Sequence, residues 1–210
     1  MKKVVFLGLG YIGLPTAAVA AGHGYEVVGV DVNPSVVETI NQGKIHIVEP
    51  ELDQIVKEVV RTGNLRAVSK PEQADAFFVV VPTPFKQNHR ADITYVESAT
   101  RSVIPYLREG NLFVIESTSP VFTTERMAEV IYKERPELKD KIYIAYCPER
   151  VLPGNTLYEL VHNDRVIGGV NPESTAKAIE FYSAFVQGKL HPTNARTRSE
   201  ERRVGKECRS

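Results

Sequence analysis

The sequence has no tryptophan, two methionines and only two cysteines among its 210 residues. Cys147 and Cys208 lie far apart and form no Cys-x-x-Cys motif, which excludes a disulfide framework and a cysteine-based zinc site. No apolar stretch approaches the roughly 20 residues that a membrane-spanning helix needs. Glycines and a proline interrupt the residues that follow the basic start, so a secretory signal is not expected. We therefore expect a cytoplasmic protein with no membrane partner.

Net charge is also lacking, because 26 basic residues balance 26 acidic ones. This balance gives no support for nucleic-acid binding. The charge is uneven, however, since residues 196–210 hold six basic and three acidic side chains. The five histidines (23, 46, 89, 162 and 191) are scattered, and we predict no metal site.

Short apolar runs alternate with segments of helical periodicity, which is typical of stacked βαβ units. The predicted strands are residues 4–7, 25–30, 65–68, 76–81, 112–115, 142–145 and 165–168. The predicted helices are residues 11–21, 34–41, 51–62, 93–107, 124–133 and 172–186, with a distortion at Pro105. We expect about six parallel strands in an α/β fold, a doubly wound Rossmann-like sheet with helices on both faces.

Residues 8–13 read Gly-Leu-Gly-Tyr-Ile-Gly and join the first predicted strand to the first predicted helix. At such a junction Gly8 permits a tight turn, Gly10 lets a pyrophosphate approach the backbone, and Gly13 lets the helix pack closely on the strand. The helix start then offers unpaired N–H groups to the phosphates. The motif predicts dinucleotide binding, with a glycine-rich turn without a ligand as the alternative.

Asp31 ends the second predicted strand, 18 residues after Gly13. A carboxylate there can accept hydrogen bonds from ribose hydroxyls and would repel a 2′-phosphate. Residues 32–34 contain no arginine that could hold such a phosphate. NAD is therefore favoured over NADP, unless Asp31 only begins the turn before the next helix.

Two further loops follow predicted strands, at residues 82–84 and 117–120, and carry hydroxyl groups. Ligands bind at the carboxyl ends of strands in open α/β sheets, so these hydroxyls could contact ribose or pyrophosphate. Thr123 and Thr124 could do the same, but helix capping is the favoured role for both.

Cys147, Glu149 and Arg150 follow the sixth predicted strand. Because no histidine lies near Cys147 in sequence to activate the thiol, we expect a small buried residue there. Glu149 and Arg150 suit an anionic substrate, with a structural ion pair as the equal alternative.

Several stretches together resemble the UDP-glucose/GDP-mannose dehydrogenase family: residues 8–15, 82–84, 116–120, 147–154 and 163–169. Residues 43–50 and 82–86 are most similar to members that act on UDP-N-acetyl-D-mannosamine, with UDP-N-acetylglucosamine and UDP-glucose as alternatives. The resemblance implies a four-electron oxidation of the sugar C6 alcohol to a uronic acid with two NAD. It also implies a UDP-sugar substrate and a homo-oligomer.

The resemblance assigns roles to particular residues. NAD would contact Tyr11, Ile12, Asp31, Thr83 and Thr124 besides the three glycines, and also Thr118, which lies near the chemistry. Glu149 would assist with the hydrolytic water, and Arg150 and Val151 would touch the substrate. Phe122 stands where the family usually has glycine, so its ring could crowd the cofactor.

The end of the sequence departs from the family. A family lysine should fall at position 202, which is arginine here, and the Gly-Gly-His-Cys stretch with the nucleophile is absent. Lys206 and Cys208 stand in the wrong context to replace them.

We predict an NAD-binding domain over residues 1–197, and a disordered, non-native segment over 198–210. The chain would bind NAD without turnover. The alternative is a non-catalytic NAD-binding module whose basic end binds an acidic partner.

Overall fold

The computed structural model describes residues 1–86 and 91–198. Residues 87–90, with His89, and 199–210, which hold Arg202, Lys206 and Cys208, lie outside the described part. The prediction of disorder for 199–210 therefore also lies outside it. Arg198, the first residue of that predicted segment, is only 3% exposed, and its Nε donates to the Val166 carbonyl at 2.8 Å. The described fold thus includes Arg198.

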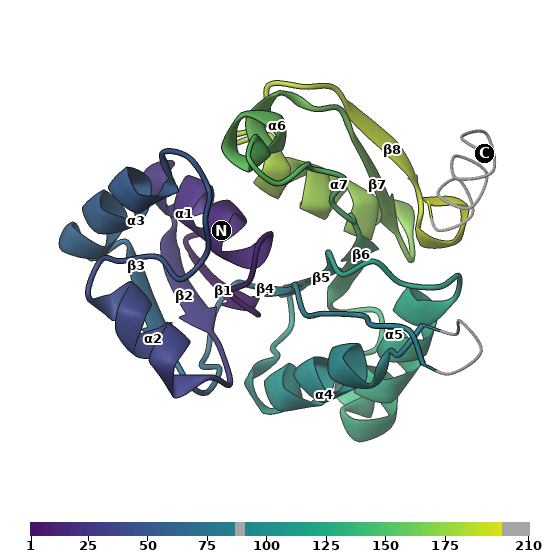
Figure 1. Ribbon diagram of the computed structural model, residues 1–210. Helices are drawn as coiled ribbons and strands as arrows, with labels where there is room; N and C mark the ends of the chain where they lie inside the picture. The colour runs from purple at the N-terminus through teal and green to yellow at the C-terminus, as the bar shows by residue number, and fades with distance from the viewer. Residues whose placement is uncertain (87–90, 199–210) are drawn as a thin grey trace.

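Eight strands form one sheet in the order β3-β2-β1-β4-β5-β6-β7-β8 (Figure 1). The strands are β1 (Lys3–Leu7), β2 (Glu26–Val30), β3 (Leu65–Val68), β4 (Ala76–Val79), β5 (Leu112–Ile115), β6 (Tyr143–Tyr146), β7 (Arg165–Gly169) and β8 (Leu190–Asn194). The first six are parallel and follow the 3-2-1-4-5-6 order of a Rossmann sheet. The predicted fold class is confirmed.

The seventh and eighth strands correct the sequence prediction. β7 runs antiparallel to β6, with Tyr146 opposite Gly168, although the sequence predicted parallel strands. β8 pairs in parallel with β7 and was not predicted. The antiparallel direction matters for the site, because it places the first residue of β7, Arg165, beyond the carboxyl end of β6.

The helices are α1 (Gly13–Gly22), α2 (Pro34–Asn41), α3 (Leu52–Arg61), α4 (Thr94–Val103), α5 (Thr123–Glu134), α6 (Thr156–His162) and α7 (Pro172–Tyr182). Asn33 caps α2 by accepting a hydrogen bond from the Ser35 N–H at 3.0 Å. Pro105 lies in a 3₁₀ turn, η2 (Ile104–Tyr106), that directly follows α4, as its ring predicts. A second 3₁₀ turn, η3 (Pro136–Leu138), follows α5. α6 was not predicted.

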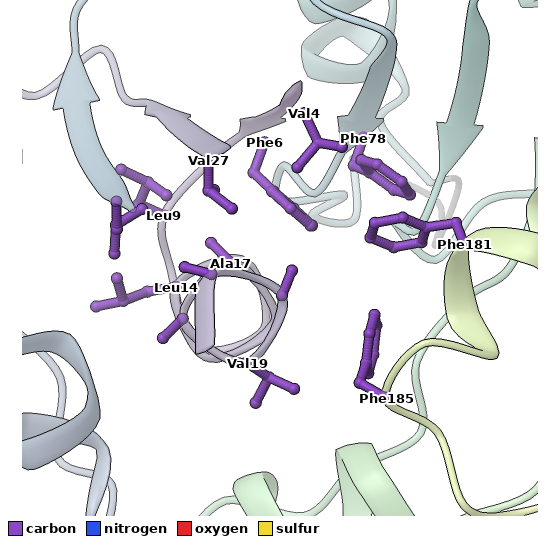
Figure 2. Packing of buried hydrophobic residues seen from close by; sticks show 14 of the residues in the cluster. Val4, Phe6, Leu9, Leu14, Ala17, Val19, Val27, Phe78, Phe181 and Phe185 are labelled. Carbon is purple, nitrogen blue, oxygen red and sulfur yellow. The ribbon is translucent and has the colours of Figure 1, made fainter. Parts of the chain in front are cut away.

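Alternate residues of the strands pack on opposite faces of the sheet. In β1, Val4 and Phe6 join one buried cluster with residues of α1, α3 and α7, whereas Val5 and Leu7 join another with residues of α4 and α5. Figure 1 shows α4 and α5 on one side of the sheet and α7 on the other. Figure 2 shows the rings of Phe78 and Phe181 beside α1. The centroids of these two rings are 4.3 Å apart. This burial on both faces holds the strand ends, and the loops that follow them, in place.

Candidate functional site

The loops after β1, β2, β4, β5 and β6 form a hydrogen-bonded row along the carboxyl edge of the sheet. Gly8 N–H donates to the Val30 carbonyl at 2.8 Å, which joins the β1 loop to β2. Val81 N–H donates to Ser117 Oγ at 2.9 Å, and Ser119 N–H donates to the Tyr146 hydroxyl at 3.1 Å. The sequence predicted the individual loops. Val80 N–H donates to the Leu7 carbonyl at 2.8 Å and joins the two halves of the row at the point where the strand order reverses between β1 and β4.

The three motif glycines differ in what surrounds them. Gly8 has φ +95°, and a Cβ there would lie 2.4 Å from the Val80 carbonyl oxygen. A Cβ on Gly13 would lie 1.9 Å from the Gly8 carbonyl oxygen, so the start of α1 packs directly on the loop. A Cβ on Gly10 would meet nothing within 4 Å. The backbone at Gly10 is therefore open to a ligand, while Gly8 and Gly13 shape the turn.

The start of α1 presents its backbone to the same open space. Its N-cap residue, Ile12, has no side-chain acceptor, and its first turn, Gly-Leu-Pro-Thr, carries no acidic group. Leu14 N–H already donates to the Gly10 carbonyl at 3.1 Å, and Pro15 has no N–H. The N–H groups of Ile12 and Gly13, together with the helix dipole, therefore favour an anion there. Tyr11, beside this space, is 51% exposed, and Ile12 is half-buried.

Asp31 connects the β2 loop to the glycine loop. Its Oδ2 accepts a hydrogen bond from Leu9 N–H at 3.0 Å, and its Oδ1 accepts one from Asn33 N–H at 2.9 Å. Asp31 therefore also starts the turn before α2, so both roles considered from the sequence fit one geometry. Each carboxylate oxygen keeps a further lone pair for a ligand hydroxyl. The neighbouring Val32 is 94% exposed.

The threonines proposed as hydroxyl contacts differ in how exposed they are. Thr83 is half-buried and Thr118 is exposed. Thr123 and Thr124 are buried in the first turn of α5, whose N-cap is Phe122 without a side-chain cap bond. The prediction that these threonines cap the helix is wrong, because α5 begins one residue earlier than predicted.

Phe122 adopts a left-handed backbone conformation with φ 70°. This region favours glycine, which accords with the glycine that the resemblance places here. The ring is 52% exposed, and the Arg196 guanidinium lies over it at 4.8 Å from the centroid.

Glu149 forms a buried ion pair with Arg165, the first residue of β7. The exposed fractions of the two side chains are 7% and 4%. Arg150, the partner considered from the sequence, is exposed instead, and Val151 is half-buried. A structural ion pair therefore exists at Glu149, but its partner is Arg165 and not Arg150, because the antiparallel β7 brings Arg165 beside Glu149.

Behind this pair lies a buried polar cluster, which we call the Glu116 cluster: Glu116, Cys147, Glu149, Arg165 and Tyr182. The Tyr182 hydroxyl donates to Glu116 Oε1 at 2.5 Å, and the Arg165 guanidinium lies 4.8 Å from the centroid of the Tyr182 ring. Burial raises the pKa of the Cys147 thiol to about 12, so the thiolate needed for nucleophilic attack is not available near neutral pH. This agrees with the expectation that Cys147 is a buried residue.

Glu49 joins two distant loops beside the exposed Arg150 segment. Its carboxylate accepts hydrogen bonds from Gly154 N–H at 2.9 Å and Thr156 N–H at 2.6 Å, and so serves the start of α6 from 105 or more residues away. Burial raises the pKa of the Glu49 carboxyl, but these N–H donors outweigh it and the pKa lies below its usual value.

We expect Glu49→Ala to lower the free energy of unfolding by about 2–3 kcal/mol, because two backbone donors lose a charged acceptor. Since the folded-state pKa is depressed, the contribution of Glu49 is present above the unfolded pKa and is lost as the pH falls through the folded pKa. Urea denaturation of wild type and variant at neutral and acidic pH measures both effects. Exposed Glu51 is the control, and equal effects of Glu49→Ala and Glu51→Ala would contradict the role of Glu49.

Other candidate features lie elsewhere or are absent from the described residues. A cavity of about 510 Å³ is lined by Gly169, Asn171, Thr175 and Asn194 among others, where β7 and β8 meet α7. No helix in the described ranges is both long and apolar enough to cross a membrane. Within the same ranges, no three His, Cys, Asp or Glu side chains gather as a metal site would require.

The model of the UDP-glucose/GDP-mannose dehydrogenase family, NAD binding domain, matches residues 2–186. The chain belongs to this family. The match includes the glycine loop, Asp31, and the loops after β4, β5 and β6, so the family's NAD-binding domain contains the whole row of loops described above. NAD is therefore the cofactor of this domain, as the sequence predicted.

Members of the family with closely similar sequences and structures act on nucleotide sugars. The chain is 53% identical over 204 residues to a UDP-N-acetyl-D-mannosamine dehydrogenase of Yersinia pestis, covering 93% of this chain and 49% of the relative. It is 50% identical to an NDP-N-acetyl-D-galactosaminuronic acid dehydrogenase of Ralstonia nicotianae, covering 93% and 48%. The structure of the UDP-N-acetyl-mannosamine dehydrogenase Cap5O from S. aureus superposes with a TM-score of 0.95 at 38% identity, covering 99% and 52%. The chain thus spans about half the length of these relatives.

Proposed function

We propose that this chain is the NAD-binding half of a dehydrogenase that oxidises the C6 alcohol of a UDP-sugar, with UDP-N-acetyl-D-mannosamine as substrate. The open backbone at Gly10, beside the uncapped start of α1 and Asp31, carries the cofactor part of this proposal. The 53% identity to a UDP-N-acetyl-D-mannosamine dehydrogenase supports the substrate. The relative acting on an N-acetyl-galactosaminuronic sugar keeps the choice of sugar open.

The residues of the glycine loop fit a dinucleotide. The backbone at Gly10 and the N–H groups of Ile12 and Gly13 would hold the pyrophosphate, with Tyr11 beside it. Asp31 would accept the adenosine ribose hydroxyls through its remaining lone pairs, and its charge would oppose a 2′-phosphate. Gly8 and Gly13 would maintain the conformation of the glycine loop.

The loops after β4, β5 and β6 would bind the other end of the cofactor and the substrate. Thr83, Thr118 and Thr124 are the proposed hydroxyl contacts, although Thr124 is only 2% exposed in this conformation. NAD supplies the hydride acceptor for the alcohol oxidation. Glu149 would hold the proton of the hydrolytic water, and Arg150 and Val151 would contact the substrate. Homo-oligomer formation, a cytoplasmic location and the absence of turnover by this chain alone stay predictions.

The test of the proposed cofactor site is Gly10→Asp, which places a carboxylate where the pyrophosphate is expected. Two like charges at about 4 Å in a partly screened site repel by roughly 4 kcal/mol, so we expect NAD affinity to fall by about 100-fold or more. The variant should keep its fold, because a side chain at Gly10 meets no neighbour. Isothermal titration calorimetry measures the affinity.

Gly22→Asp, at the other end of α1, is the matched control for this experiment, since a Cβ at Gly22 also meets nothing within 4 Å. We expect the control to bind NAD as the wild-type chain does. Unchanged NAD affinity in Gly10→Asp, or equal loss in both variants, would reject the proposed pyrophosphate position.

A further inference from the structure

The loop that carries Thr118 is held on both sides of that residue. Ser117 and Ser119 are 5% and 8% exposed, whereas Thr118 between them is exposed. The Ser117 hydroxyl accepts a hydrogen bond from Val81 N–H at 2.9 Å and donates to the Val81 carbonyl at 2.8 Å. Ser119 Oγ donates to the Ser117 carbonyl at 3.0 Å. Thr118 is therefore presented at the surface by two neighbours that are themselves fixed.

The Ser119 backbone is held by a side chain and not by a strand. The hydrogen bond from Cys147 N–H to the Ile115 carbonyl, at 3.0 Å, lies at the end of the paired part of β5 and β6, and Ser119 lies beyond it. There the Tyr146 hydroxyl accepts a hydrogen bond from Ser119 N–H at 3.1 Å and donates to the Ser119 carbonyl at 3.3 Å. One hydroxyl group thus pairs with both backbone groups of Ser119, as a neighbouring strand would.

The Tyr146 ring is itself fixed by packing. It is fully buried and belongs to the cluster between the sheet and helices α4 and α5, which also contains Phe113, Met127 and Ile131. Close packing confines such a ring to one rotamer, and the position of the hydroxyl follows from it. The position of the Thr118 loop relative to the sheet is therefore determined by one rigid side chain of β6.

We infer that Tyr146 is a positioning residue for Thr118, and through Thr118 for the bound dinucleotide. The inference rests on the proposed function, in which Thr118 is a hydroxyl contact of NAD. Because Tyr146 is 0% exposed, it acts through the loop and not by touching the cofactor. Without its hydroxyl, the N–H and carbonyl groups of Ser119 would bond to water and the loop would sample other positions. The fraction of molecules in which Thr118 faces the cofactor then falls, and the apparent affinity falls with it.

The first measurement is amide hydrogen exchange of the full 210-residue chain without ligand, followed by NMR and corrected for intrinsic rates. In wild type we expect the Ser119 amide to exchange at least about tenfold more slowly than the amide of exposed Thr118. Tyr146→Phe keeps the ring and removes the hydroxyl, so the Ser119 amide should lose this protection. The Val81 amide, bonded to Ser117, should keep its own.

Tyr143→Phe is the matched control, because it removes a hydroxyl from the same strand but on the opposite face of the sheet, where Tyr143 packs against the other buried cluster. We expect this variant to leave the exchange of the Ser119 amide unchanged. An unchanged Ser119 rate in Tyr146→Phe, or equal changes in Tyr146→Phe and Tyr143→Phe, would overturn the inference. The wild-type chain decides independently if Tyr146→Phe does not fold, because a Ser119 amide that exchanges as fast as that of Thr118 also overturns it.

The second measurement is NAD affinity in a double-mutant cycle, by isothermal titration calorimetry. Thr118→Val removes the exposed hydroxyl and should weaken NAD binding by about three- to tenfold, the effect of one hydrogen bond. Tyr146→Phe should weaken it by a similar factor. If Tyr146 acts through Thr118, the double variant binds no more weakly than the weaker of the two single variants. A general loss of stability would add its effect to that of Thr118→Val, so additive losses would overturn the inference.

Failure of this inference is distinguishable from failure of the proposed cofactor site. If Thr118→Val binds NAD as the wild-type chain does, the positioning role of Tyr146 is overturned. Gly10→Asp tests the pyrophosphate position separately, at a loop that Tyr146 does not hold. A loss of affinity in Gly10→Asp without one in Thr118→Val would therefore keep the cofactor site and reject the role of Tyr146.

Discussion

Arg165→Met is expected to lower the free energy of unfolding at neutral pH by about 3–5 kcal/mol, because it leaves buried carboxyl groups without their cation. Both Glu149 and Glu116 lose a stabilising partner. The variant must then keep Glu116, whose pKa is already raised by burial, protonated when folded. A group whose folded pKa is raised stabilises the fold below its unfolded pKa and loses that contribution as the pH rises. The destabilisation should therefore be larger at about pH 8 than at about pH 5.

Urea denaturation at the two pH values measures this effect. Arg101→Met is the control, since Arg101 forms ion pairs with Glu97 and Glu134 but its side chain is 49% exposed. We expect the control to cost less than about 1 kcal/mol. If Arg165→Met lowers the free energy of unfolding no more than Arg101→Met does, the buried ion pair stabilises the fold no more than an exposed one, which would contradict the prediction.

Gly13→Ala is expected both to destabilise the fold and to weaken NAD binding. The new Cβ would lie 1.9 Å from the Gly8 carbonyl oxygen, so α1 or the glycine loop must move. Overpacking of this kind costs about 1–3 kcal/mol. The displaced loop no longer presents Gly10 and the start of α1 to the pyrophosphate, and affinity should fall by at least about tenfold.

Gly22→Ala adds the same methyl group at the other end of α1, where nothing lies within 4 Å. We expect it to raise stability by about 0.4–1 kcal/mol and to leave NAD binding unchanged. Thermal unfolding and calorimetric titration of both variants separate the two effects. A Gly13→Ala chain that binds NAD like Gly22→Ala would show that the close packing at Gly13 is not needed.

The local parts of the site could be predicted from the sequence because local chemistry determines them. The glycine loop and Asp31 each depend on residues close in sequence and on a strand-to-helix junction. The burial of β1 on both faces is likewise encoded in its own run of apolar residues. The fold class and the cofactor could be predicted from these local features.

The parts that were missed depend on contacts distant in sequence. The direction of β7 is determined by its pairing with β6, and with it the position of Arg165 beside Glu149. β8 contains a proline and no buried residue, so it lacks the apolar pattern of a strand and is identified only by its pairing with β7. The Glu49 carboxylate accepts hydrogen bonds from N–H groups at the start of α6, and no local motif indicates this contact.

The most direct test of the proposed cofactor site is an amide NMR titration of this chain with NAD and, separately, with NADP. We predict that NAD shifts the signals of Gly8, Gly10, Ile12 and Asp31, and that NADP binds at least about tenfold more weakly because Asp31 repels its 2′-phosphate. Shifts confined to Gly169, Asn171 and Thr175, which line the cavity beside α7, would place the nucleotide elsewhere and contradict the assignment. So would equal affinity for the two cofactors.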